Sequence, residues 1–126
     1  PEYSSAASDV YKRQAVKSPS KAKEFWVPLF EKFNMDLVVE SDGHVIKRTV
    51  PIRNEKEDPT GIVYVGEGGL GVPQRKPKSD RWYLQKPGMA GAGHHVIRVT
   101  FSKDKMDYEV VLLDRQQADK HQFFPR

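Results

Sequence analysis

Residues 25–52 read FWVPLFEKFNMDLVVESDGHVIKRTVPI, and this stretch decides which fold the chain can adopt. It passes from an aromatic segment with helical spacing into a short apolar run at residues 36–40. A polar turn follows, in which Asp42 and His44 stand two residues apart, and residues 45–52 then look extended. In many α/β enzymes a buried strand ends in a loop that carries the functional side chains. The stretch therefore predicts that Asp42 and His44 belong to a site.

A helix is predicted ahead of that strand. Ser18 is a typical N-cap, Pro19 suits the first helical turn, and Asn34 suits a left-handed helix end. Pro28 predicts a kink or a restart, because proline lacks the N–H that the helix ladder needs. The apolar residues of this segment recur at helical spacing and form one face, made by Ala22, Phe25, Trp26, Leu29, Phe30 and Phe33.

The rest of the chain is dominated by predicted strands. Residues 61–65, GIVYV, form a short strand by their β-branched and aromatic content. Residues 66–87 are rich in glycine, proline and charge, which predicts a long loop. Residues 95–102 and 106–114 alternate on either side of a short polar turn and predict a β-hairpin, whereas residues 115–126 give no clear signal. The predicted fold class is α+β, with short mixed strands and a C-terminal β-hairpin.

Composition narrows the classes of partner and site. The 126 residues contain no cysteine, which excludes disulfides and zinc–thiolate sites. The formal net charge is +4, but basic and acidic residues interleave along the chain rather than forming one stripe. We therefore expect no nucleic-acid partner. No apolar run approaches the length of a membrane span, so no membrane segment is expected.

Asp42 and His44 can be interpreted in two ways from the residues alone. Side chains two apart on an extended segment point to the same side, so a carboxylate and an imidazole here could reach one metal centre or two adjacent ones. Oxygen and nitrogen together suit iron, zinc or manganese. However, Asp42-Gly43 between two apolar runs is also a strong signal for a plain hairpin turn. Both interpretations remain open at this point.

The whole stretch resembles the last signature block of the calcineurin-like metallophosphoesterases, and especially of the purple acid phosphatases. That block follows the pattern WxPLFEKYxVDLVLSGHxHxYERTxPI, and about thirty residues of this chain match it in register. His44 keeps the second histidine of the pattern, and Asp42 replaces the first. The resemblance implies a four-layer αββα domain that holds two metal ions (iron, zinc or manganese) and hydrolyses a phosphate-ester substrate with metal-activated water. It also favours an extracellular or periplasmic location.

The same resemblance implies roles for individual residues. Asp42 would bind one metal ion and His44 the other. Arg48 could approach a phosphate, but we expect it instead to pair with a carboxylate behind the loop. Glu40 is expected to accept a hydrogen bond from a metal-binding histidine.

A glycine-rich segment follows the strand at residues 61–65. Residues 66–71 spell GxGxxG, yet Val72-Pro73 follows instead of a helix, so we do not expect a nucleotide site. The segment resembles the GxVYxxxGGGG stretch of the same family, which implies that Gly68 and Gly69 lie at the rim of the site. His94 is a further candidate for this rim, with a simple turn histidine as the alternative.

Residues 1–14, PEYSSAASDVYKRQ, resemble a translated sequencing-adaptor read-through and are expected to be a non-native tail. Residues 15–126 would then be the C-terminal portion of a metallophosphoesterase domain. The family's other ligands lie in Asp-x-His, Gly-Asp-x-x-Tyr and Gly-Asn-His-Glu blocks, which are expected in an upstream part of the same chain. This chain alone is therefore expected to be inactive. Two alternatives are a stand-alone β-rich binding module and a degenerate phosphoesterase relative without activity.

Overall fold

The computed structural model describes residues 21–41, 43–66 and 68–125. The predicted tail at residues 1–14, the helix cap at Ser18-Pro19 and the candidate ligand Asp42 lie outside these residues. Along the chain the elements are α1 (Lys21–Lys32), β1 (Leu37–Val39), β2 (Ile46–Arg48), β3 (Ile52–Arg53), β4 (Lys56–Glu57), β5 (Val63–Gly66), the 3-10 helix η2 (Trp82–Leu84), β6 (Met89–Gly91), β7 (His95–Phe101), β8 (Met106–Leu112) and β9 (Gln117–Phe123). The α+β fold class is confirmed.

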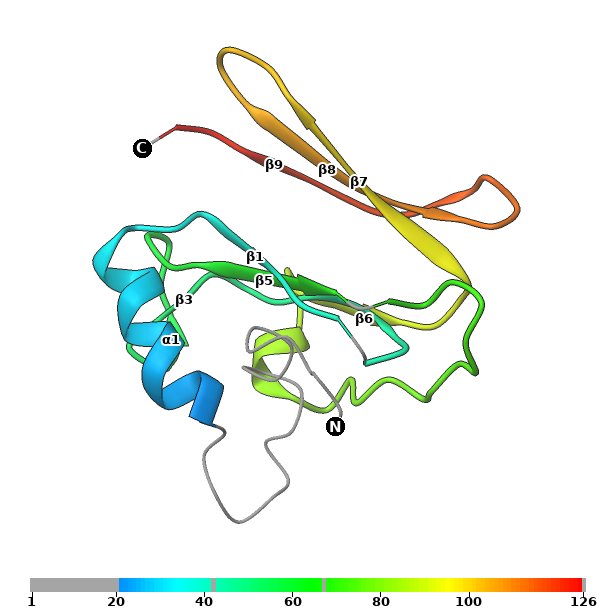
Figure 1. Cartoon of the computed structure of the whole chain (residues 1–126), viewed down its shortest axis with the longest axis horizontal. Helices are drawn as coiled ribbons and strands as arrows, with labels where there is room; N and C mark the ends of the chain where they lie inside the picture. The colour runs from blue at the N-terminus through cyan, green and yellow to red at the C-terminus, as the bar shows by residue number, and fades with distance from the viewer. Residues whose placement is uncertain (1–20, 42, 67, 126) are drawn as a thin grey trace.

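Two larger sheets and one helix form the layers of the fold. The first sheet has the strand order β1-β5-β2-β6, in which β1 and β5 are parallel and the other pairs are antiparallel. The second sheet is an antiparallel meander in the order β7-β8-β9. Figure 1 shows this second sheet above the first, with α1 on the opposite side of the first sheet. Strands β3 and β4 form a small separate hairpin.

Two apolar clusters hold the layers together, one on each face of the first sheet. Side chains of β5 alternate between them, because successive residues of a strand point to opposite faces. Val63 and Val65 face the second sheet, as does Ile46 of β2, and they pack against Tyr108 and Val110 of β8. The other cluster lies under α1 and η2 and contains Val27, Val38, Val50, Ile52, Ile62, Tyr64 and Tyr83. Strand β5 is buried on both faces, which explains why its sequence is an unbroken apolar run.

The predicted hairpin is confirmed as β7 and β8, and the short strands at residues 36–40 and 61–65 are confirmed as β1 and β5. Residues 45–52 do not form one strand, because the chain leaves the ladder between β2 and β3. The backbone nitrogen of Thr49 donates to the Tyr64 carbonyl at 2.9 Å, and the backbone nitrogen of Tyr64 donates to the Thr49 hydroxyl oxygen at 3.0 Å. Strand β9, whose residues carry no clear strand pattern, completes the second sheet.

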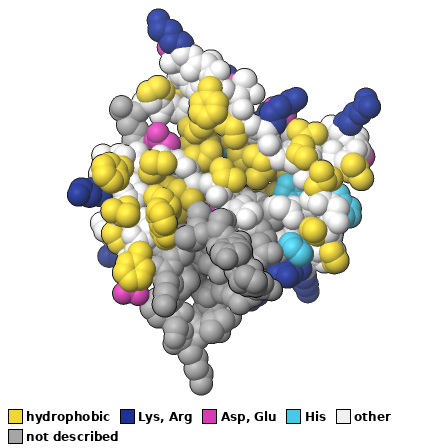
Figure 2. Space-filling view, in the orientation of Figure 1, with side chains coloured by type: hydrophobic (Ala, Val, Ile, Leu, Met, Phe, Trp, Pro, Cys, Tyr) yellow, Lys and Arg dark blue, Asp and Glu magenta, His cyan; other side chains and the backbone are white. Residues whose placement is uncertain are grey.

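Helix α1 forms where expected, but most of the apolar face predicted for it is exposed. The helix continues through Pro28 as one element, so a restart there is wrong, and Asn34 adopts the expected left-handed conformation after its end (φ 49°). Among the side chains of α1 that the structure describes, Val27 and Phe30 pack on the sheet. Figure 2 shows hydrophobic side chains gathered over α1 on the left of the view. The exposed apolar residues in and just after this helix include Phe25, Trp26, Leu29 and Phe33.

No helix in the described residues has the length and apolar character required to cross a bilayer.

Candidate functional site

The candidate site is built on the parallel pair of strands β1 and β5. Leu37, Val38 and Val39 pair in register with Val63, Tyr64 and Val65, so both strands end at the same edge of the sheet. The backbone nitrogen of Glu40 donates to the Val65 carbonyl at 2.7 Å, which extends this pairing by one residue. Ligand-binding loops of open α/β sheets lie beyond the carboxyl ends of such strands. The structure therefore places the loop of His44 and the glycine-rich loop at one edge.

The connection from β1 to β2 is not a hairpin turn. Strand β5 lies between β1 and β2 in the sheet, so the two strands that flank Asp42-Gly43 are not hydrogen-bonded neighbours. The hairpin interpretation of these residues is therefore wrong. A loop that must pass over an intervening strand cannot be a tight two-residue turn, and it is free to project side chains beyond the sheet edge.

His44 is held by two hydrogen bonds to the segment after the glycine-rich loop. It is half-buried and adopts a left-handed backbone conformation (φ 59°), which is uncommon for a residue with a side chain. Its ring nitrogen Nδ1 lies 3.0 Å from the carbonyl oxygen of Pro73, and the backbone nitrogen of Arg75 donates to the His44 carbonyl at 3.1 Å. A carbonyl can only accept, so Nδ1 must carry the hydrogen. In the neutral ring this leaves the lone pair on Nε2.

The glycine-rich loop and the turn before β7 meet beside this segment. Gly68 is left-handed (φ 66°), which a glycine adopts without strain. Gly69 lies so close to the ring of His95 that a Cβ atom there would overlap it. The Gly69 carbonyl accepts from Nδ1 of His94 at 2.9 Å and from the Gln74 amide at 2.7 Å. Gly69 and His94, two of the predicted rim residues, are thus brought together.

We call this set of residues the loop cluster: His44, Gly69, Pro73, Gln74, Arg75 and His94. Figure 2 shows histidine side chains gathered on the right of the view. Gln74 was not identified from the sequence, because a single glutamine in a polar loop carries no distinguishing pattern. His95 is buried, and its Nε2 has no hydrogen-bond partner among the described residues.

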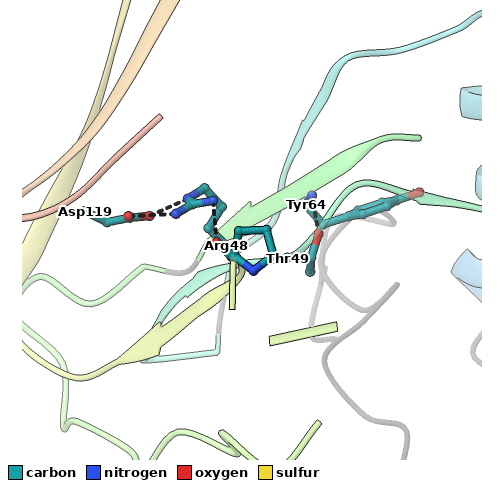
Figure 3. Close-up of polar contacts among 5 residues, drawn as sticks. Arg48, Thr49, Tyr64 and Asp119 are labelled. Atoms are coloured by element: carbon teal, nitrogen blue, oxygen red, sulfur yellow. Dashed lines mark hydrogen bonds and ion pairs between the residues drawn. The ribbon is translucent and has the colours of Figure 1, made fainter. Parts of the chain in front are cut away.

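The Arg48 side chain is directed at the second sheet, where it pairs with a carboxylate, as expected. Figure 3 shows its guanidinium directed at Asp119 of β9, with Nε–Oδ2 and Nη2–Oδ1 distances of 2.7 and 3.0 Å. Nη1 also donates to the Pro87 carbonyl at 3.1 Å. The two side chains are only 11% and 9% exposed, so the pair lies between the two sheets. A phosphate-contacting role for Arg48 does not fit this geometry.

Glu40 has a charged partner on the neighbouring strand β2. Its carboxylate forms a buried ion pair with the ammonium group of Lys47, on the face of the first sheet that carries α1 and η2. Tyr83 of η2 lies beside this pair. Burial raises the pKa of the Tyr83 hydroxyl, and the positive charge of Lys47 opposes that shift. Glu40 thus neutralises a buried cation at the base of the loop.

The described residues do not contain a complete metal site. Among them, no group of three or more histidine, aspartate or glutamate side chains is placed to hold a metal ion. His44 by itself fits a metal ligand, since a metal-binding histidine commonly donates its second ring N–H to a backbone carbonyl. Any remaining ligands would have to come from residues outside the described ranges.

The chain matches no protein-family model and no curated protein.

Proposed function

We propose that this chain is the C-terminal part of a metal-dependent phosphoesterase domain, and that His44 supplies one metal ligand to it. The hydrogen bond from His44 Nδ1 to the Pro73 carbonyl carries this proposal. It selects the tautomer whose Nε2 lone pair can bind a metal ion, and the contact resembles those that orient metal-binding histidines elsewhere.

The position of the loop supports the proposal. His44 follows the carboxyl end of β1, and the glycine-rich loop follows the carboxyl end of the parallel strand β5. A site shared by these loops would lie where α/β enzymes place their ligands. Asp42 remains part of the proposal as the ligand of a second metal ion. The upstream part of the same chain would provide the other ligands and the rest of a four-layer αββα domain.

The proposal assigns limited tasks to the residues of this chain. When bound, a pair of iron, zinc or manganese ions would activate water and stabilise the charge on the phosphoryl oxygens of a phosphate ester. His44 would fix one ligand direction, because its ring is held at Nδ1 and its backbone carbonyl is held by Arg75. Gly68, Gly69 and His94 would line the rim.

A zinc titration of the 126-residue chain tests the role of His44 directly. The NMR signals of the imidazole rings report which histidine responds. We expect weak binding, because two ligands cannot complete a coordination sphere, with the largest shift at His44. His44→Ala should abolish the response. His121→Ala is the matched control, since His121 lies on β9 in the second sheet, and it should leave the response unchanged. A response unaffected by His44→Ala would contradict the proposal.

A second experiment tests the catalytic part. The source DNA upstream of the codon for Ala15 should continue in frame into the three family blocks, and the longer protein should hydrolyse an aryl phosphate. His44→Ala should remove this activity. A longer protein that binds fewer than two metal ions and shows no hydrolysis would instead indicate a degenerate relative. Turnover by the 126-residue chain alone, removed by His44→Ala, would refute the assignment of the chain as an incomplete part.

A further inference from the structure

The side chain of Gln74 binds three backbone groups, two in its own loop and one in the turn before β7. Its amide nitrogen Nε2 donates to the carbonyl oxygens of Gly69 at 2.7 Å and of Val72 at 3.1 Å. Its amide oxygen accepts from the backbone nitrogen of Gly93 at 2.9 Å. A primary amide has two hydrogens to donate, and both are used here. The orientation of the amide is fixed by these contacts, because the flipped amide would place its oxygen against two carbonyl oxygens.

The two residues on either side of Gln74 hold His44. The carbonyl of Pro73 accepts from His44 Nδ1, and the backbone nitrogen of Arg75 donates to the His44 carbonyl. These groups are part of the same short backbone segment that the Gln74 side chain fastens to Gly69 and Gly93. Their positions relative to His44 therefore depend on the three bonds of one amide.

The same amide also acts on His94. Gln74 Nε2 lies 3.3 Å from Nδ1 of His94, but both of its hydrogens are directed at carbonyl oxygens. His94 Nδ1 therefore donates to the Gly69 carbonyl at 2.9 Å instead of accepting from Gln74. As a result both His44 and His94 carry a hydrogen on Nδ1 when they are neutral, and both carry the lone pair on Nε2.

From these contacts we infer that Gln74 is a positioning residue that selects the Nδ1–H tautomer of His44 and His94. It acts through the backbone of residues 69–75 and touches neither a substrate nor a metal ion. The consequence for metal binding and phosphate-ester hydrolysis rests on the proposed function, since the Nε2 lone pair is the group a metal ion would use. The tautomers themselves are properties of this chain without any metal.

Long-range proton–nitrogen NMR correlations of the imidazole rings test this inference, because they distinguish the two neutral tautomers. The ¹⁵N-labelled chain is measured without metal at a pH at which the rings are neutral. We expect one tautomer with Nδ1–H at both His44 and His94. Gln74→Glu keeps the size of the side chain and an acceptor for Gly93, but it cannot donate to the two carbonyls. Both rings should then exchange between tautomers. Gln74→Ala should have the same effect.

Gln85→Ala is the matched control. Gln85 also donates its side-chain amide to a backbone carbonyl, that of Ser79, in a different loop. It should leave both tautomers unchanged. The amide signals of β7–β9 report whether each variant is folded.

The inference is overturned if either ring exchanges tautomers in the unmodified chain. It is equally overturned if a folded Gln74 variant retains Nδ1–H at both rings. Unfolding of both Gln74 variants would also overturn it, because Gln74 would then support the whole fold and not the two histidines. If the tautomers respond to Gln74 as expected but His44 does not respond to zinc, the proposed function is refuted and this inference stands. If His44 responds to zinc but the tautomers do not depend on Gln74, this inference is refuted and the proposed function stands.

Discussion

The ion pair between Arg48 and Asp119 should be a main connection between the two sheets. Asp119→Ala removes both hydrogen bonds that Asp119 accepts from the guanidinium, and only the bond to the Pro87 carbonyl remains. Both side chains of the pair are about nine-tenths buried, so a charged guanidinium would be left between the sheets without a counterion. Breaking a buried pair in this way typically costs about 3–5 kcal/mol. We expect about 3 kcal/mol, because one hydrogen bond of Arg48 persists.

Chemical unfolding in urea, followed by circular dichroism, measures this loss. The double variant Arg48→Met with Asp119→Leu should be more stable than Asp119→Ala, because it leaves no unpaired charge between the sheets. The chain also offers a matched control in Arg98 and Glu109, which form the same kind of forked pair at 3.2 and 3.0 Å. The Arg98 side chain is 66% exposed, and solvent weakens such a pair. Glu109→Ala should therefore cost much less than Asp119→Ala.

An equal loss from Asp119→Ala and Glu109→Ala would refute this reasoning, and so would a double variant no more stable than Asp119→Ala. The pKa of His121 gives a readout that does not depend on stability. Burial lowers the pKa of His121, the charge of Arg48 lowers it further, and Asp119 opposes both. Asp119→Asn should therefore lower this pKa, whereas Arg48→Met should raise it. An NMR titration that shows shifts of the same sign would contradict the arrangement.

Three further predictions concern other buried groups. The hydroxyl of Tyr108 is buried and has no hydrogen-bond partner in the described part of the chain. Tyr108→Phe should therefore leave the free energy of unfolding unchanged or raise it by up to about 1 kcal/mol. A clear loss of stability in urea unfolding would show that the hydroxyl has a partner. Because the pKa of His121 is below its ordinary value of 6.5, the unfolded chain binds this proton more readily than the folded one. The free energy of unfolding should therefore fall as the pH drops below about 6.5. His121→Phe should reduce this dependence on pH, and an unchanged slope would show that His121 does not cause it. Gly69→Ala should lower the melting temperature, because the new Cβ overlaps the His95 ring. The loss should be smaller in a His95→Ala background, and an equal loss in both backgrounds would show that the two residues do not interact.

Local pattern was sufficient for the elements whose side chains repeat with the period of their backbone. The alternation in residues 95–102 and 106–114 predicted β7 and β8, because each strand buries one face and exposes the other. The β-branched and aromatic content of residues 61–65 predicted a short strand, and the structure shows that β5 is buried on both faces. Strand β9 carries a bulge against β8 and mixes polar residues on both faces, so its sequence contains no period to detect.

For the candidate site, the sequence determined the residues and the tertiary structure decided their partners. The resemblance drew attention to the loop that carries His44. The sequence could not show which carboxylate Arg48 would meet, because Asp119 lies 71 positions later. Local pattern also could not show that β5 would insert between β1 and β2, and this strand order excludes the hairpin interpretation of the connection between them. Strand order depends on which long-range pairing buries the most apolar surface, and that free energy belongs to the assembled sheets and not to any single segment.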